Sequence, residues 1–146
     1  MTAARFDELP RWARELIERA PVGRLGLLDF DDAPRVLPIT FAIVGEKLWT
    51  AVDSKPKRSP GRELARVRWL RRRPGAALTV DRYDDDWSRL AWVQALGEVS
   101  IEENAPEDVL EALVAKYRQY EDEAPGGPFI GLEPRRFVHW RAAGED

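Results

Sequence analysis

The residues with the greatest capacity for binding chemistry lie in one basic segment, TAVDSKPKRSPGRELARVRWLRRRP, residues 50 to 74. It holds two lysines and seven arginines, although the whole chain has a net charge of -3. Arginine forks and lysine ammonium groups bind phosphate, and Lys55, Lys57 and Arg58 fall in a predicted loop before a predicted helix. The first N–H groups of that helix add positive potential. Both a phosphate site for a small molecule and a purely structural cluster fit this pattern.

Other parts of the chain argue against nucleic acid as the partner of this segment. The acidic stretch EVSIEENAPEDVLE (98–111) would repel a phosphate backbone. Arg71 to Arg73 are explained by their place in the last helical turn, where cations complement the helix dipole. The unexplained cations are therefore Lys55, Lys57 and Arg58.

The stretch RVLPITFAIV (35–44) reads as a strand with two unlike faces. The bulky, core-like face consists of Leu37, Ile39, Phe41 and Ile43. The small, flat face consists of Val36, Pro38, Thr40 and Ala42. A planar ring could lie against the small face, with its phosphate on the loop that follows TAVD (50–53). Packing of small residues at a subunit interface explains the same face.

Several classes of catalytic site are excluded or disfavoured. The chain has no cysteine and one histidine, His139, which falls inside a strand pattern, so thiol catalysis and multi-histidine metal sites are ruled out. It contains no glycine-rich dinucleotide motif and no P-loop. The acidic turn DRYDDDW (81–87) offers carboxylates to a hard cation, but its spacing matches no calcium loop and favours a solvated hairpin tip. No metal site is expected.

Periodicity and turn signals predict a mainly β, α+β chain. Helices are expected at 7–20, at 60–73 with Ser59 as N-cap, and at 105–120. Strands are expected at 22–30, 35–44, 48–53, 76–83, 90–103 and 135–142, with a possible bulge at Gly97. Six antiparallel strands interrupted by helices indicate a small, partly closed barrel with flanking helices.

Length and composition support one globular domain over residues 1–146. No apolar run reaches the roughly 18 residues of a membrane span, and the N-terminus has no apolar signal region. We therefore expect a cytoplasmic protein without a membrane partner.

Three stretches resemble the F420-dependent class of pyridoxamine 5′-phosphate oxidase-like flavin/deazaflavin oxidoreductases. They are RLGLLDFDDAPRVLPITFAIVGEKLWTAVDSKPKR, RRRPGAALTVDRYDDDWSRLAWVQALGEV and YRQY. The resemblance covers roughly residues 15 to 140. It implies a homodimer of six-stranded split barrels, with two cofactor sites at the interface and a small-molecule substrate.

The resemblance also implies positions for the cofactor. The ring would lie against Leu37, Pro38, Ile39, Thr40, Ala51, Val52 and Asp53. Its phosphate and acidic tail would lie near Lys55, Lys57 and Arg58. Trp87 and Trp92 would line the substrate side, with the partner chain as a possible source. Trp69 stands where a polar residue is typical, so Arg66 or Arg68 is a candidate additional phosphate ligand.

The implied activity is hydride transfer between C5 of F420 and a small organic acceptor. No protein nucleophile is needed for it, so no catalytic side chain is assigned. Tyr83 is a candidate proton source, but core packing explains it better. Three alternatives stay open: an FMN-dependent enzyme on the same fold, a protein that binds F420 or FMN without turnover, and an interaction module without a cofactor.

Overall fold

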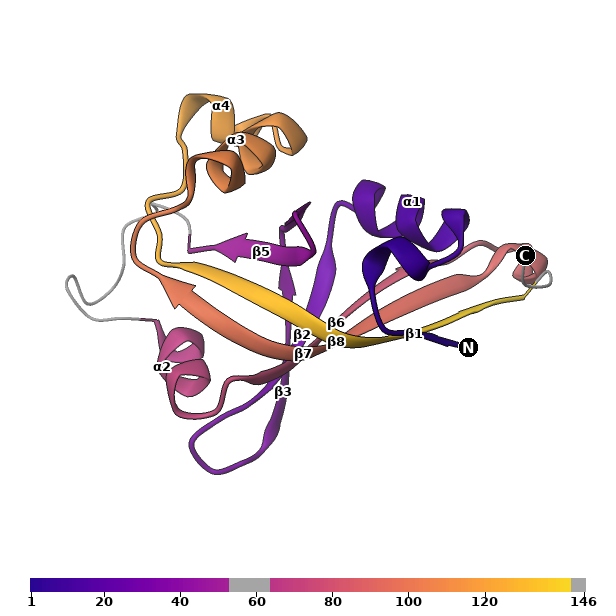
Figure 1. Ribbon diagram of the computed structural model, residues 1–146, viewed down its shortest axis with the longest axis horizontal. Coiled ribbons are helices and arrows are strands. Elements are labelled where there is room, and N and C mark those ends of the chain that lie inside the picture. Colours follow the sequence, from indigo (N-terminus) through magenta and orange to yellow (C-terminus); the bar gives the residue numbers. More distant parts are fainter. Residues whose placement is uncertain (53–63, 143–146) are drawn as a thin grey trace.

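The computed structural model describes residues 1–52 and 64–142. All its strands join one antiparallel sheet that curls around a core (Figure 1). The strands are β1 (Thr2–Ala3), β2 (Gly23–Leu28), β3 (Pro34–Ile39), β4 (Ala42–Val44), β5 (Lys47–Ala51), β6 (Gly75–Arg82), β7 (Ala91–Glu102) and β8 (Phe129–Arg141). The helices are α1 (Arg11–Arg19), α2 (Ala65–Arg72), α3 (Glu107–Lys116) and α4 (Gln119–Asp122), with 3₁₀ turns η1 (Phe6–Glu8) and η2 (Trp87–Arg89).

The sheet runs in the order β3-β2-β6-β7-β8-β5-β4, with β1 paired to β8. Its two end strands, β3 and β4, are consecutive in the chain and are separated only by Thr40 and Phe41. The sheet therefore curls until its ends come together without pairing, which is a split barrel. This confirms the predicted fold class. The predicted continuous strand 35–44 is wrong in one respect, because the backbone leaves the sheet at Thr40 and divides it into β3 and β4.

The inner face of the curled sheet carries the main core. Inward side chains alternate with outward ones along the strands, as a half-buried sheet requires. Both α1 and α2 pack on this inner face. The core includes Ala13 and Ile17 of α1, Val67 and Leu70 of α2, and Phe41, Leu78, Val80, Val93 and Phe137.

A second, smaller core forms where α3 covers β4 and β5. It contains Ala42, Trp49, Val109, Leu113 and Phe129. Gly131 is needed here, because an added Cβ would lie 2.8 Å from the Trp49 ring. Ala42 is thus covered by a helix and does not form part of an open flat face with Pro38.

The long antiparallel pair of β7 and β8 contains the predicted irregularity at Gly97. The strand register shifts between Leu96 and Gly97. An added Cβ at Gly97 would collide with the carbonyl oxygen of Glu133, so only glycine fits this bulge. The predicted start of the last strand at residue 135 is wrong, since β8 begins at Phe129. The apolar run FIGL (129–132) pairs with both β5 and β7.

The helices are shorter than predicted. The first begins at Arg11, after Pro10, rather than at residue 7. The predicted helix 105–120 breaks at Tyr117, whose backbone is extended, and this separates α3 from α4. The second begins at Ala65, because Leu64 is extended with φ −58° and ψ 147°. The predicted N-cap Ser59 lies outside the described residues. Within 1–52 and 64–142, no helix is both long and apolar enough to cross a membrane.

Candidate functional site

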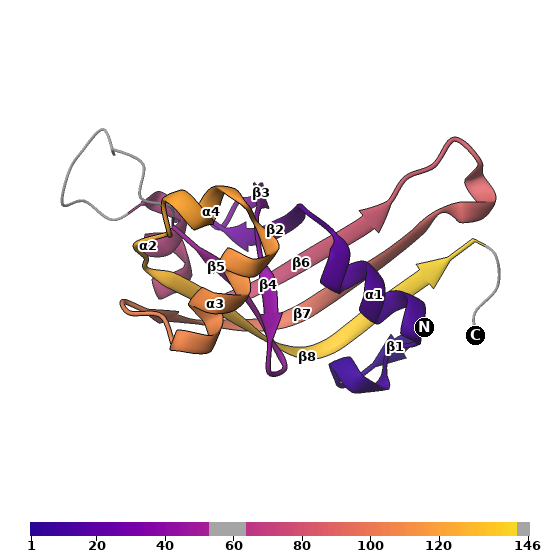
Figure 2. The same ribbon diagram turned by 90° about the horizontal axis from the view of Figure 1, so that it is seen from above.

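A cleft of about 240 Å³ opens where the sheet splits. Three segments and one further side chain line it: the end of β3, the end of β5, the start of α2, and Tyr120 of α4. Figure 2 shows α2, α4 and the end of β5 on one side of the molecule. The lining residues are Pro38, Ile39, Thr40, Thr50, Ala51, Val52, Leu64, Arg66 and Tyr120.

The path of the chain brings the ends of β3 and β5 to the same place. After Phe41 the chain forms β4, turns tightly at Gly45, and returns as β5. Gly45 has φ 63°, a left-handed conformation that glycine adopts without steric cost. Beyond β5, the Val52 N–H donates to the Pro128 carbonyl oxygen at 3.0 Å and holds the cleft wall against the loop before β8.

Two tyrosines three residues apart, in the motif YRQY, reach this region and have different partners. The Tyr117 hydroxyl accepts a hydrogen bond from the Phe41 N–H at 3.0 Å, and it lies within donating distance of the Phe41 and Pro21 carbonyl oxygens. Burial raises the pKa of Tyr117, so the phenol stays protonated. The Tyr120 hydroxyl instead lies 2.9 Å from the Thr40 hydroxyl, at the cleft.

The arginines of α2 divide into two groups. Those at its C-terminal end are neutralised by acids: Arg71 by Glu103 at 2.8 Å, and Arg72 and Arg73 by Asp32, each at 3.1 Å. Nearer the start of the helix, the Arg68 guanidinium lies 5.1 Å from the centroid of the Phe30 ring. Arg66 lines the cleft, and no ion pair to it occurs among the described residues.

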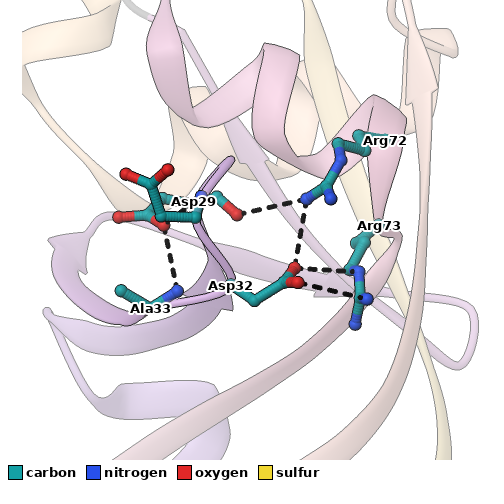
Figure 3. Close-up of polar contacts among 6 residues, drawn as sticks. Asp29, Asp32, Ala33, Arg72 and Arg73 are labelled. Atoms are coloured by element: carbon teal, nitrogen blue, oxygen red, sulfur yellow. Dashed lines mark hydrogen bonds and ion pairs between the residues drawn. The ribbon is translucent and has the colours of Figure 1, made fainter.

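The turn between β2 and β3 holds the C-terminal end of α2 (Figure 3). Asp29 accepts from the N–H groups of Asp31 and Ala33, at 2.9 and 3.0 Å, and these bonds shape the turn. The backbone bond from Ala33 is the largest cause that lowers the pKa of Asp29. Asp32 adopts φ 59° and presents its carboxylate to Arg72 and Arg73. With its last turn fixed, the helix keeps its first turn at the cleft.

The residues predicted to contact the cofactor ring or its phosphate and tail fall into three groups. Pro38, Ile39, Thr40, Ala51 and Val52 come together in the cleft. Leu37 does not line the cleft and packs against the main core. Asp53, Lys55, Lys57 and Arg58 lie outside the described residues.

The two predicted tryptophans lie away from this cleft within one chain. Trp87 belongs to η2, in the connection between β6 and β7, and is 68% exposed. Trp92 follows at the start of β7, paired with Asp81 and Trp140. The connection between β6 and β7 projects on the side of the molecule opposite to α2 and α4 (Figures 1 and 2).

Other candidate residues are also placed by the structure. Tyr83 was expected to pack in the core, and this is wrong, since it is 69% exposed beside the acidic turn. In that turn Asp86 accepts from the Ser88 N–H and hydroxyl, and Asp84 pairs with Arg89. Among the described residues, no group of three or more His, Cys, Asp or Glu side chains is placed to hold a metal ion. His139 is buried in β8, with the Trp12 ring edge-on at 5.9 Å between centroids.

Sequence reasoning missed Thr50, Leu64 and Tyr120 as cleft residues. It also left Arg66 and Arg68 as equal candidates, which the structure separates. The motif YRQY was a usable signal for Tyr120, because it is one of the three stretches that carry the family resemblance. No sequence pattern indicated that this segment would reach Thr40.

The sequence matches no protein-family model, and no curated protein matches it. Solved structures do share its fold. A conserved hypothetical protein from Mycobacterium tuberculosis is 17% identical with a TM-score of 0.70, over 88% of this chain and 81% of that one. An F420 reductase is 23% identical with a TM-score of 0.60, over 89% and 98%. A FAD-binding protein from Mesorhizobium loti is 19% identical with a TM-score of 0.61, over 86% and 87%. The chain thus has the fold of pyridoxamine-phosphate-oxidase-like split barrels.

Proposed function

We propose that this protein is an F420-dependent oxidoreductase, which binds the deazaflavin ring in the cleft between β3 and β5. The observation that carries the proposal is the gathering of Pro38, Ile39, Thr40, Ala51 and Val52 around one cleft that also holds a cationic side chain. These are residues for which the resemblance implied ring contact. An F420 reductase and a FAD-binding protein of the same fold are consistent with it.

The chemistry of the lining fits a planar heterocycle with an anionic tail. Pro38, Ile39 and Val52 offer apolar contact to ring faces, and the hydroxyls of Thr40, Thr50 and Tyr120 offer hydrogen bonds to a polar ring edge. Arg66 offers a guanidinium to phosphate or carboxylate. We propose that Lys55, Lys57 and Arg58 extend this positive charge along the tail.

In this proposal the bound coenzyme supplies hydride exchange at its ring carbon C5. The protein's own residues act by binding and orientation. Apolar residues of β3 and β5 exclude water from one ring face, and Arg66 fixes the charged end. We assign no nucleophilic role to a side chain, and the described residues that line the cleft carry apolar, hydroxyl and guanidinium groups.

We further propose that the protein is a homodimer whose second chain completes the cleft. The outer face of β3, β2, β6, β7 and β8 lies opposite α1 and α2, and apolar side chains on it are open: Val36 is 65% exposed and Trp140 42%. Pro38 lies on this face, because it pairs with outward-facing Arg24, and it also lines the cleft. One chain's cleft of about 240 Å³ is below the range of roughly 300–1,000 Å³ typical of ligand pockets.

A dimer through this face would give the tryptophans a role. Trp92 and Trp140 are cross-strand neighbours at one end of the outer face, near exposed Trp87. We propose that Trp87 and Trp92 of each chain line the substrate side of the partner's cleft. The acceptor would then be a small organic molecule held between tryptophan rings and the coenzyme.

The experiment that tests the function is a paired titration of the purified protein with F420 and with FMN, followed by coenzyme fluorescence at low and high salt. Salt-sensitive F420 binding that is tighter than FMN binding supports the proposal, and turnover with reduced F420 then separates an enzyme from a non-catalytic binder. Tighter FMN binding would replace the deazaflavin assignment with a flavin-dependent one. Binding of neither coenzyme would overturn the proposed function.

A further inference from the structure

The hydroxyl groups of Thr40 and Tyr120 form an isolated pair at the cleft. They come from the end of β3 and from α4, and their oxygens are 2.9 Å apart. Both side chains are half-buried and both line the cleft. Within the described part of the chain, neither hydroxyl has another hydrogen-bond partner.

Counting protons shows what this pair can offer. Each hydroxyl has one proton to donate, and the bond between the two oxygens uses only one of them. Among residues 1–52 and 64–142 the second proton therefore has no acceptor, and it is available to water or to a bound molecule. Tyr117 differs, because its single proton is already directed at the Phe41 or Pro21 carbonyl oxygen.

The apolar neighbours of the pair increase the difference in affinity between ligands that have a hydrogen-bond acceptor and ligands that have none. The pair stands beside Ile39, Ala51 and Val52, whose side chains provide no hydrogen bonds. When a ligand without an acceptor displaces water from such a site, one hydroxyl proton loses its partner, which costs free energy. A ligand with a suitably placed oxygen avoids that cost.

We propose that the Thr40–Tyr120 pair is a specificity element that donates one hydrogen bond to a carbonyl-type oxygen of the molecule bound in the cleft. The ligand class is a planar, conjugated molecule with an exposed acceptor oxygen, whether this oxygen belongs to the acceptor substrate or to the coenzyme ring. The proposal deepens the proposed function by naming the group that the cleft recognises, and it rests on the same cleft.

The pair also predicts an unusual pattern among variants. In Tyr120→Phe the Thr40 hydroxyl keeps its proton, and in Thr40→Val the Tyr120 hydroxyl keeps its own. Each single variant thus retains one hydroxyl donor. The hydroxyl that oriented this donor is gone. Only the double variant lacks both donors of this pair. We expect the double variant to lose more affinity than the two single losses multiplied together.

The test uses two probes that differ by one oxygen, 2-acetylnaphthalene and 2-ethylnaphthalene, with binding followed by ligand-observed NMR. The intact protein should bind the ketone about tenfold more tightly than the hydrocarbon, the scale of one buried hydrogen bond. Each single variant should lose about twofold of that preference, and the double variant most of it, since Thr50 and Arg66 still offer donors in the cleft. Thr2→Val, which removes an exposed hydroxyl of β1 that does not line the cleft, should leave it unchanged.

The outcomes separate this inference from the proposed function. An unchanged ketone preference in a folded double variant, or no preference in the intact protein, overturns the inference even if F420 binds. Failure of F420 and FMN to bind overturns the proposed function even if the ketone preference is present and is lost as expected. Titration of the same variants with F420 identifies the source of the oxygen. Weaker coenzyme binding in the double variant assigns it to the ring, and unchanged coenzyme binding assigns it to the substrate.

Discussion

Tyr117 binds both backbone polar groups of Phe41 through one hydroxyl. The Phe41 N–H donates to this oxygen at 3.0 Å, and the Phe41 carbonyl oxygen lies 3.0 Å from it. Phe41 is where the chain leaves β3 and enters β4, so these groups have no partner in the sheet ladder. At the split of the barrel, the Tyr117 hydroxyl thus makes the backbone hydrogen bonds that a neighbouring strand would otherwise make with Phe41.

Replacing this hydroxyl should destabilise the fold. In Tyr117→Phe the buried Phe41 N–H loses its acceptor, and we expect the free energy of unfolding to fall by about 1–3 kcal/mol. Urea denaturation followed by tryptophan fluorescence measures the change. Tyr83→Phe is the matched control, since its phenol is exposed, and it should lie within about 0.5 kcal/mol of the parent protein. Equal stability of Tyr117→Phe and the parent would contradict this account.

Arg66 and Arg68 should differ in their effect on coenzyme binding. Arg66→Ala removes the guanidinium that lines the cleft. We expect F420 binding to become weaker by about 1–3 kcal/mol in binding free energy, which appears as a higher Kd. Arg68→Ala removes a guanidinium that lies over Phe30 and should leave the Kd within about twofold. Fluorescence titration of both variants decides the matter. Losses of equal size would remove the distinction between the two arginines.

Lys116 should make stability depend on alkaline pH. Its ammonium lies 3.9 Å from the centroid of the Phe41 ring and has no hydrogen-bond partner among the described residues. Burial lowers the pKa of Lys116 to about 8 from the usual 10.5. The folded state therefore releases this proton before the unfolded state does, so its stability rises as the pH increases from about 8 toward 10.5.

The substitution Lys116→Met removes this titration. We expect the variant to be more stable than the parent at pH 7 by about 1 kcal/mol, a value reduced because the side chain is partly exposed and the Phe41 ring attracts the ammonium. The advantage should shrink as the pH approaches 10.5. Chemical denaturation of both proteins at pH 7 and pH 10 measures it. An advantage that grows with pH would have the wrong sign.

The stability lost on substituting Asp32 should depend both on how well the new residue adopts a positive φ and on the loss of the carboxylate charge. Asp32→Asn keeps a residue that adopts positive φ and loses only exposed ion pairs, so we expect a loss below about 1 kcal/mol. Asp32→Val adds the strain of a β-branched residue at φ 59° and should cost about 1–2 kcal/mol more. Thermal unfolding compares the two. A valine variant as stable as the asparagine variant would show that the turn relaxes.

The proposed dimer face can be tested by placing a charge on it. Val36→Glu should produce monomers and weaken coenzyme binding, because the open face would then carry a carboxylate beside the cleft wall. Light scattering during size-exclusion chromatography gives the mass. Ala115→Glu, on the exposed side of α3, is the control and should remain dimeric. A monomeric parent protein would overturn the dimer proposal directly.

Sequence patterns predicted the barrel well because its strands alternate regularly between core and outer face. The bulge at Gly97 could be located because a glycine interrupted a long strand. The early start of β8 was missed, since FIGL followed a glycine- and proline-rich loop and its pairing with β5 depends on distant residues. The break at Tyr117 was missed for a similar reason: helical spacing continues through residue 120, and the hydrogen bonds to Phe41 and Pro21 appear only in the folded chain.

The same distinction applies to the cleft. Pro38 and Thr40 were identified from strand periodicity and small size, which are local properties, whereas Ile39, Ala51 and Val52 were expected at the cofactor only through the family resemblance. The contributions of α2 and α4 depend on how these helices pack against the split, which no local pattern specifies. Arg66 could be separated from its neighbours only once their partners were visible.

The clamp of Asp32 on Arg72 and Arg73 has a consequence for ionic strength. Of the five described arginines in α2 and its C-cap, three, Arg71 to Arg73, have acidic partners, so added salt screens pairs within the protein at that end of the helix. The helix would then act on an anion mainly through Arg66 in its first turn. Its contribution to the salt dependence of binding should resemble that of a single charge, much less than its arginine content suggests.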